Sequence, residues 1–172
     1  MTDRRKIKAQ KTALLALLLA AALILSYIEA VFPLSSGLPF FKLGLSNIAV
    51  VTVLYLYGGK TAAAFGGLKC LLSLLFTGRL ASLFFSLTGT AFSLTGMILL
   101  KNRKSFSLFG VSVTGAILHI WGQMAAAAIF YNGAAPFRLL PILTVTSAFS
   151  GALVWLISGV LLKTAKKTAF FP

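Results

Sequence analysis

Long apolar stretches alternate along this chain with short segments that are polar, glycine-rich or interrupted by proline. A bilayer core of about 30 Å requires roughly 17–25 apolar residues in helical form. Six stretches approach that length, and we expect each to form a transmembrane helix: residues 12–32, 43–57, 61–77, 81–100, 109–131 and 138–162. The pattern predicts an all-α integral membrane protein with a single transmembrane domain over residues 1–172.

The second and third stretches are the shorter ones, and only residues 58–60 separate them. We expect a tight helical hairpin here, with a tilted or partly re-entrant pair as the alternative. Before the hairpin, Pro33 and Pro39 prevent helix continuation and predict a loop over 33–41.

The first stretch follows basic residues, as in a secretory signal, but it exceeds the apolar core of about 7–15 residues of a cleavable signal. We therefore expect a membrane helix there.

Composition agrees with a membrane environment. Of the 172 residues, 59% are hydrophobic and 10% are charged, and the mean hydropathy is +0.97. Soluble domains typically carry about a quarter charged residues. The net charge of +14 would suggest nucleic acid in a soluble protein, but here the basic residues lie mainly in short runs between apolar stretches. The charge therefore indicates membrane topology and not nucleic-acid binding.

The distribution of the sixteen Lys and Arg residues predicts an orientation. Twelve precede the first helix, lie in the 58–60 turn, or follow the fourth and sixth helices. Three lie on the other side, and one, Lys69, falls within the third helix. Because Lys and Arg accumulate in cytoplasmic segments, we expect six spans with both termini in the cytoplasm.

Few polar groups lie within or beside the apolar stretches. Glu29 is near the outer end of the first helix and Lys42 just precedes the second, so the loop could bring them together. They would form either a structural ion pair or a ligand contact. Asn47, further into the second helix, is interpreted as an interhelical hydrogen-bonding residue or a substrate contact.

Lys69 lies about two helical turns from either end of its stretch. It could snorkel to the surface, but we favour an internal partner such as Glu29, or an anionic ligand. Arg79 and Arg138 are at predicted outer helix ends, where snorkelling to lipid headgroups is the simplest interpretation. With Lys42 and Lys69 they could instead form an electropositive outer pocket for a phosphate, carboxylate or diphosphate.

His119 and Gln123 are four residues apart and share one face of the fifth helix at mid-membrane depth. They are either a hydrogen-bonded structural pair or part of a binding site. Trp121 should point elsewhere and pack against the protein or meet lipid.

Several kinds of chemistry have no support in the sequence. Residues 58–61 resemble the end of a phosphate-binding P-loop, but Leu54 occupies the position of its first glycine. Two acids, Asp3 and Glu29, at opposite sides of the membrane cannot cluster around a cation for diphosphate chemistry. One cysteine and one histidine in different helices do not suit zinc. We expect no metal, no cofactor and no catalysis by this chain alone.

Three stretches carry a family resemblance: Ser26-Tyr27-Ile28-Glu29, Lys42-Leu43-Gly44-Leu45-Ser46-Asn47-Ile48, and Gly110-Val111-Ser112-Val113-Thr114-Gly115-Ala116 leading to His119-Ile120-Trp121-Gly122-Gln123. Together they resemble the membrane family called heptaprenyl diphosphate synthase component I, or Gx transporter family. The likeness spans nearly the whole chain, and the stretch from Lys42 to Ile48 is its most specific part. The sequence departs from the pattern at Ile120, where many relatives have Asn.

That family is similar to the S components of energy-coupling-factor transporters. These six-helix proteins capture vitamins or precursors on the outer side and are driven by a coupling subunit and ATPases. The resemblance implies an S-component-like bundle in a bacterial cytoplasmic membrane, with a small anionic or amphipathic ligand such as a vitamin, flavin, quinone or isoprenoid precursor. It assigns ligand capture to Glu29, Lys42, Asn47, Lys69, His119 and Gln123.

Ala16 and Ala20 have the small-xxx-small spacing that S components use to dock a coupling subunit, although close helix packing explains it equally well. Two other functions stay open. The chain could be an accessory subunit of a soluble polyprenyl diphosphate synthase, or a scaffold of a membrane redox complex.

Overall fold

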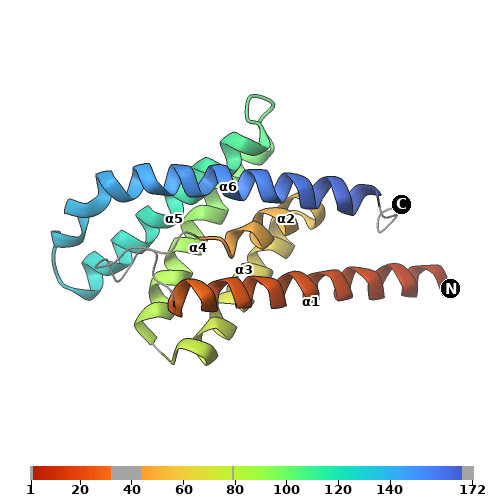
Figure 1. The fold of residues 1–172 in the computed structure, drawn as a ribbon, viewed down its shortest axis with the longest axis horizontal. Coiled ribbons are helices and arrows are strands. Elements are labelled where there is room, and N and C mark those ends of the chain that lie inside the picture. Colours follow the sequence, from red (N-terminus) through yellow and green to blue (C-terminus); the bar gives the residue numbers. More distant parts are fainter. Residues whose placement is uncertain (1, 32–43, 79, 168–172) are drawn as a thin grey trace.

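The computed structural model describes residues 2–31, 44–78 and 80–167, and the regular elements in these ranges are all helices (Figure 1). In chain order they are α1 (Thr2–Val31), α2 (Asn47–Tyr57), α3 (Gly59–Thr77), α4 (Leu80–Lys101), α5 (Leu108–Phe130), the short 3-10 helix η1 (Ala135–Leu139) and α6 (Leu140–Lys167). The predicted all-α class is confirmed for these residues.

Within the described residues, five segments are long and apolar enough to cross a membrane, namely α1, α3, α4, α5 and η1 with α6. They coincide with five of the six predicted stretches. The main difference is in α1, which begins well before the predicted 12–32 stretch and continues the helix through the basic N-terminal residues. Residues 5–13 of α1 are exposed, as expected for the part that leaves the apolar bundle.

The remaining predicted stretch, 43–57, which is the second in chain order, needs a correction. The helix begins only at Asn47, and residues 45 and 46 form a turn. Its 11 residues rise about 16 Å, too little to cross the bilayer core alone. The hairpin with α3 is confirmed: Gly58 joins the two helices with a φ of 84°, a conformation that favours glycine.

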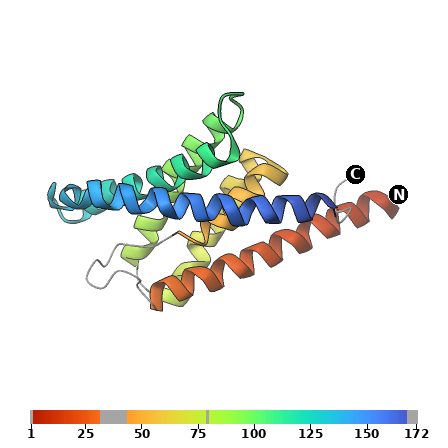
Figure 2. The ribbon, with the colours of Figure 1, turned by 45° about the horizontal axis from the view of Figure 1, so that its top comes forward.

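Although it is short, α2 lies at the centre of the fold. Every residue from Asn47 to Leu54 is buried, because α1, α3 and α6 pack around the helix (Figures 1 and 2). Leu18 of α1, Phe65 of α3 and Val154 of α6 belong to the same buried cluster. A helix that is apolar on all sides is typical of a buried position, which is why hydropathy alone made α2 resemble a membrane span.

Glycines bring α4, α5 and α6 into close contact. A Cβ added at Gly122 in α5 would lie 2.7 Å from the backbone oxygen of Thr88 in α4. One added at Gly151 in α6 would lie 2.6 Å from the Cα of Val113 in α5. Small residues allow membrane helices to approach in this way. Here they fix how closely α4 and α6 pack against α5, the helix that carries His119.

The start of α1 and the last turns of α6 lie at the same end of the bundle (Figure 1). At this end Lys11 Nζ is 4.8 Å from the ring centroid of Tyr57, and Lys101 Nζ donates a 2.7 Å hydrogen bond to the Leu54 carbonyl. A cation at the last carbonyls of α2 is also favoured by the helix dipole. The start of α1, the end of α4 and the end of α6 carry basic residues that the charge distribution assigns to the cytoplasm. These three segments thus lie on one side of the molecule.

The orientation can be tested by labelling single cysteines in a Cys70→Ala background. Lys60 in the first turn of α3 and Arg138 in η1 are both exposed. We expect a membrane-impermeant maleimide to label Arg138→Cys in intact cells, and Lys60→Cys only after permeabilisation. If only Lys60→Cys were labelled in intact cells, the orientation would be the opposite of the one predicted.

Candidate functional site

A buried ammonium group and a buried carboxylate flank the N-terminal turn of α2. Lys69 of α3 is 4% exposed, and its Nζ donates to Ser46 Oγ and Asn47 Oδ1, each at 3.2 Å. Glu29 of α1 is 6% exposed, and its Oε1 accepts a hydrogen bond from the Leu45 backbone N–H at 2.7 Å. These contacts bring together α1, α3 and the start of α2.

The electrostatic environment at the N-terminal turn of α2 favours an anion. The N-terminus of a helix carries a partial positive charge, so the Glu29 carboxylate is stabilised there whereas the Lys69 ammonium is not. The Lys69 ammonium donates hydrogen bonds to the side-chain oxygens of Ser46 and Asn47. Charged groups inside a membrane bundle are costly and usually mark a ligand or ion site.

Glu29 and Lys69 line the same small cavity, together with Ser26, Thr90 and His119. The cavity volume is about 20 Å³, which accommodates about one water molecule. Three ionisable side chains, from α1, α3 and α5, therefore face one enclosed space. The sequence singled out all three, and the structure brings them together.

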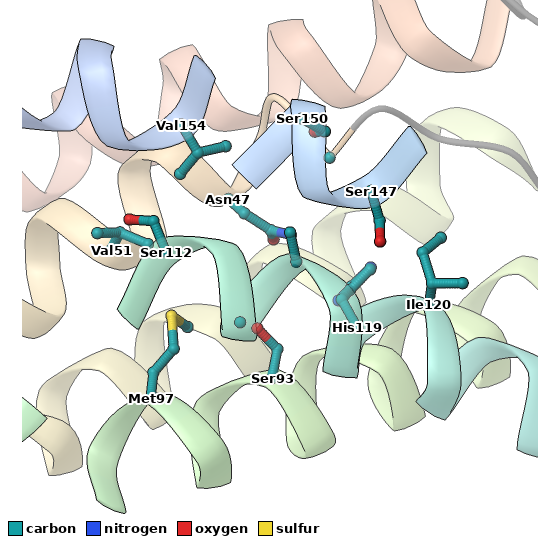
Figure 3. Close-up of a pocket in the computed structure, with 13 residues that line it drawn as sticks. Asn47, Val51, Ser93, Met97, Ser112, His119, Ile120, Ser147, Ser150 and Val154 are labelled. Carbon is teal, nitrogen blue, oxygen red and sulfur yellow. The ribbon is translucent and has the colours of Figure 1, made fainter. Parts of the chain in front are cut away.

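A second cavity of about 10 Å³ adjoins the first, since Gly44 and His119 line both. Figure 3 shows His119 with Ser93 of α4 and Ser147 of α6 on either side of it. Neutral hydroxyl and amide groups replace the charged ones here. His119 thus lies between a charged compartment and a hydroxyl-rich one.

The fifth helix provides the His119–Gln123 contact that the spacing predicted. The Gln123 Nε2 and His119 Nε2 atoms are 3.1 Å apart, and both side chains are buried. Gln123 Oε1, Ser93 Oγ and Ser112 Oγ are also buried and have no hydrogen-bond partner among the described residues. Buried polar atoms rarely lack a partner, so water or a ligand is the expected one.

The serines of this interior were missed by the sequence interpretation. Ser147 and Ser150 line the second cavity, and Ser158, on the same face of α6, is fully buried. Burying a serine in an apolar helix costs little free energy, so a serine there does not by itself indicate a site. The recurrence of serine and glycine every three or four residues would have been the signal, because that period marks one helix face.

The other residues that the sequence singled out either lie away from these contacts or fall outside the described residues. Lys42 and Arg79 are outside the described residues. Arg138 is exposed in η1 and lines neither cavity. Ala16 and Ala20 are exposed on α1. Trp121 is 47% exposed and donates through Nε1 to Thr144 Oγ1 at 3.2 Å, so it lies on the outer surface as predicted.

Comparison with known families agrees with the resemblance carried by the sequence motifs. The family model described as heptaprenyl diphosphate synthase component I matches residues 18–161. The chain belongs to this family. The match to the component I model runs from the first membrane helix to the last and includes every residue of the buried site. No curated protein and no solved structure matches the chain.

The contribution of Glu29 to the stability of the α2 turn can be tested by substitution. Glu29→Ala removes the acceptor of the Leu45 N–H and should destabilise the fold by about 1–3 kcal/mol, the usual cost of an unsatisfied buried donor. Glu29→Gln keeps an acceptor oxygen and should cost less. Denaturant unfolding in detergent measures both. An equal loss in the two variants would show that the negative charge, and not the hydrogen bond, stabilises this turn.

Proposed function

We propose that this chain is a membrane-embedded binding component that captures a small polar ligand with an anionic group, in the manner of a transporter S component. The observation that carries the proposal is the convergence of Glu29, Lys69 and His119 on one enclosed cavity. A purely structural bundle gains nothing from burying three ionisable groups at one point, because apolar packing there would cost less.

The residues suit an anion with further polar groups. The Lys69 ammonium and the positive end of α2 favour a carboxylate or phosphate. Ser93, Ser112 and Gln123 provide buried hydrogen-bonding atoms nearby. The charged and neutral compartments meet at His119, so one ligand could contact both.

The size of the cavities sets a condition on this proposal. With volumes of about 20 and 10 Å³, they are far below the roughly 300–1,000 Å³ typical of small-molecule pockets. A vitamin-sized ligand would require the helices around His119 to separate. The ligand-bound state would then be a second, more open conformation.

The family name supports a second candidate, a non-catalytic membrane subunit of a heptaprenyl diphosphate synthase. The two acids of the chain cannot cluster to hold the cation of such chemistry, so a soluble partner would supply the active site. This candidate predicts that a carboxylate-rich partner co-purifies, and that the amount or chain length of the product changes when this chain is omitted.

The direct test of the first proposal is a thermal-stability screen of the purified protein. Flavins, quinone precursors, isoprenoid phosphates and vitamins are added separately, because a ligand that binds the folded state must stabilise it. We expect a shift with at least one anionic compound. The absence of any compound-specific shift would sink the binding proposal.

A further inference from the structure

A groove near the termini of the bundle is separate from the buried site. It lies between the end of α2, the start of α5 and the last part of α6, and its volume is about 510 Å³. Tyr55, Leu108, Trp155, Gly159 and Val160 form most of its apolar wall, and Lys163 lies at the α6 end. This volume is within the range of ligand-binding pockets.

The wall has the character of a membrane–water boundary. Trp155 packs edge-on against Phe109, with ring centroids 5.3 Å apart. Lys101 Nζ lies 5.2 Å from the ring centroid of Tyr55. Aromatic rings beside lysines are typical of the headgroup level of a bilayer. Val160 is 57% exposed, so the groove opens toward the surface that faces lipid.

The chain offers few acids to balance the cations at this end. Asp3 and Glu29 are its only acids, and Glu29 is engaged near the start of α2. Lys163 and Lys101 therefore lie in a chain whose basic residues far outnumber its acids, which favours an anionic partner from outside the protein. Basic pockets between membrane helices on the cytoplasmic side are suited to anionic lipid headgroups, and the charge distribution predicts that this end is cytoplasmic.

We propose that this groove binds one anionic phospholipid of the inner leaflet, with an acyl chain along the α6 wall and the phosphate beside Lys163. Gly159 leaves room for the chain, since the nearest atom to a Cβ added there is Leu108 Cδ2 at 3.8 Å. A larger side chain at 159 would take up space in the groove, which Gly159 lines.

Native mass spectrometry of the full chain in detergent tests this site. Phosphatidylglycerol and phosphatidylcholine with identical acyl chains are supplied at equal concentration. We expect preferential retention of one phosphatidylglycerol molecule. Lys163→Gln should weaken its binding about fivefold, the effect of one basic residue at a membrane surface. Gly159→Leu should weaken both lipids, because it fills the acyl-chain space.

Lys167→Gln is the matched control, since Lys167 is an exposed lysine one turn further along α6 that does not line the groove. It should leave retention unchanged. Equal retention of the two lipids, or an equal effect of Lys163→Gln and Lys167→Gln, would overturn the proposal. Displacement of phosphatidylglycerol by an equimolar long-chain prenyl diphosphate would overturn the phospholipid assignment and give the groove to that ligand. Lys163→Gln changes an exposed residue and should fold normally, so the test does not depend on Gly159→Leu.

Discussion

Replacing Gly122 with alanine should destabilise the bundle by about 1–3 kcal/mol, the usual cost of forcing an extra methyl group into a packed interior. The added Cβ would lie 2.7 Å from the Thr88 backbone oxygen and 2.9 Å from the Gly89 Cα. Backbone atoms of a helix cannot rotate away as a side chain does, so α4 and α5 would have to separate. Unfolding of the detergent-solubilised protein measures the loss.

Gly67→Ala is the matched control for this change. Gly67 is also in a helix, α3, but apart from its chain neighbours and its own helix backbone, no atom of the described residues lies within 4 Å of a Cβ added there. Alanine should be neutral at this position or stabilising by about 0.5–1 kcal/mol, because it restricts the unfolded chain more than glycine does. If both variants lost the same stability, the close approach of α4 and α5 would not be the reason that Gly122 is needed.

Lys69→Met should abolish ligand binding while leaving the unliganded fold within about 1 kcal/mol of wild type. Methionine keeps most of the side-chain volume and removes the cost of burying an ammonium group. That gain offsets the loss of the hydrogen bonds to Ser46 and Asn47. Loss of a buried charged contact to a ligand typically costs 2–5 kcal/mol of binding energy, or on the order of 30-fold or more in affinity.

The measurement compares the thermal shift caused by the best compound of the ligand screen in the wild type, Lys69→Met and Lys60→Met. Lys60 is an exposed lysine in the first turn of the same helix, so its replacement should retain the shift. A Lys69→Met protein that still responds fully to the compound would contradict a ligand-binding role. A marked fall in unliganded stability would instead assign Lys69 to the support of α2.

The sequence predicted much of this architecture because membrane spans depend on hydropathy and length. It also singled out Glu29, Asn47, Lys69, His119 and Gln123, since a polar group in an apolar stretch is conspicuous. Hydropathy showed that the second stretch is one of the shorter ones, but it did not reveal that α2 is buried by its neighbours. An interior helix and a lipid-facing helix have similar compositions, and only the packing of the neighbouring helices distinguishes them.

The partners of these residues were harder to predict. Glu29 was paired with Lys42 or Lys69, which stays a prediction, and the contact that the sequence did not indicate is the hydrogen bond from the Leu45 backbone N–H. Lys69 was expected to contact an acid or a ligand, which also stays a prediction, and its hydrogen bonds to Ser46 and Asn47 were not predicted. Such contacts depend on how α1, α2 and α3 are rotated about their axes, and hydropathy does not determine that rotation.

The short, buried α2 has a consequence for how the protein enters the membrane during synthesis. Its 11 residues are too few to be released into lipid as an independent span, and a lysine at the centre of a helix adds about 2.5–3.5 kcal/mol to the insertion cost of α3. Neither helix of the hairpin is therefore a favourable insertion unit alone. We expect the translocon to retain α2 and α3 until later helices can shield them, which makes this pair the step at which assembly is most easily interrupted.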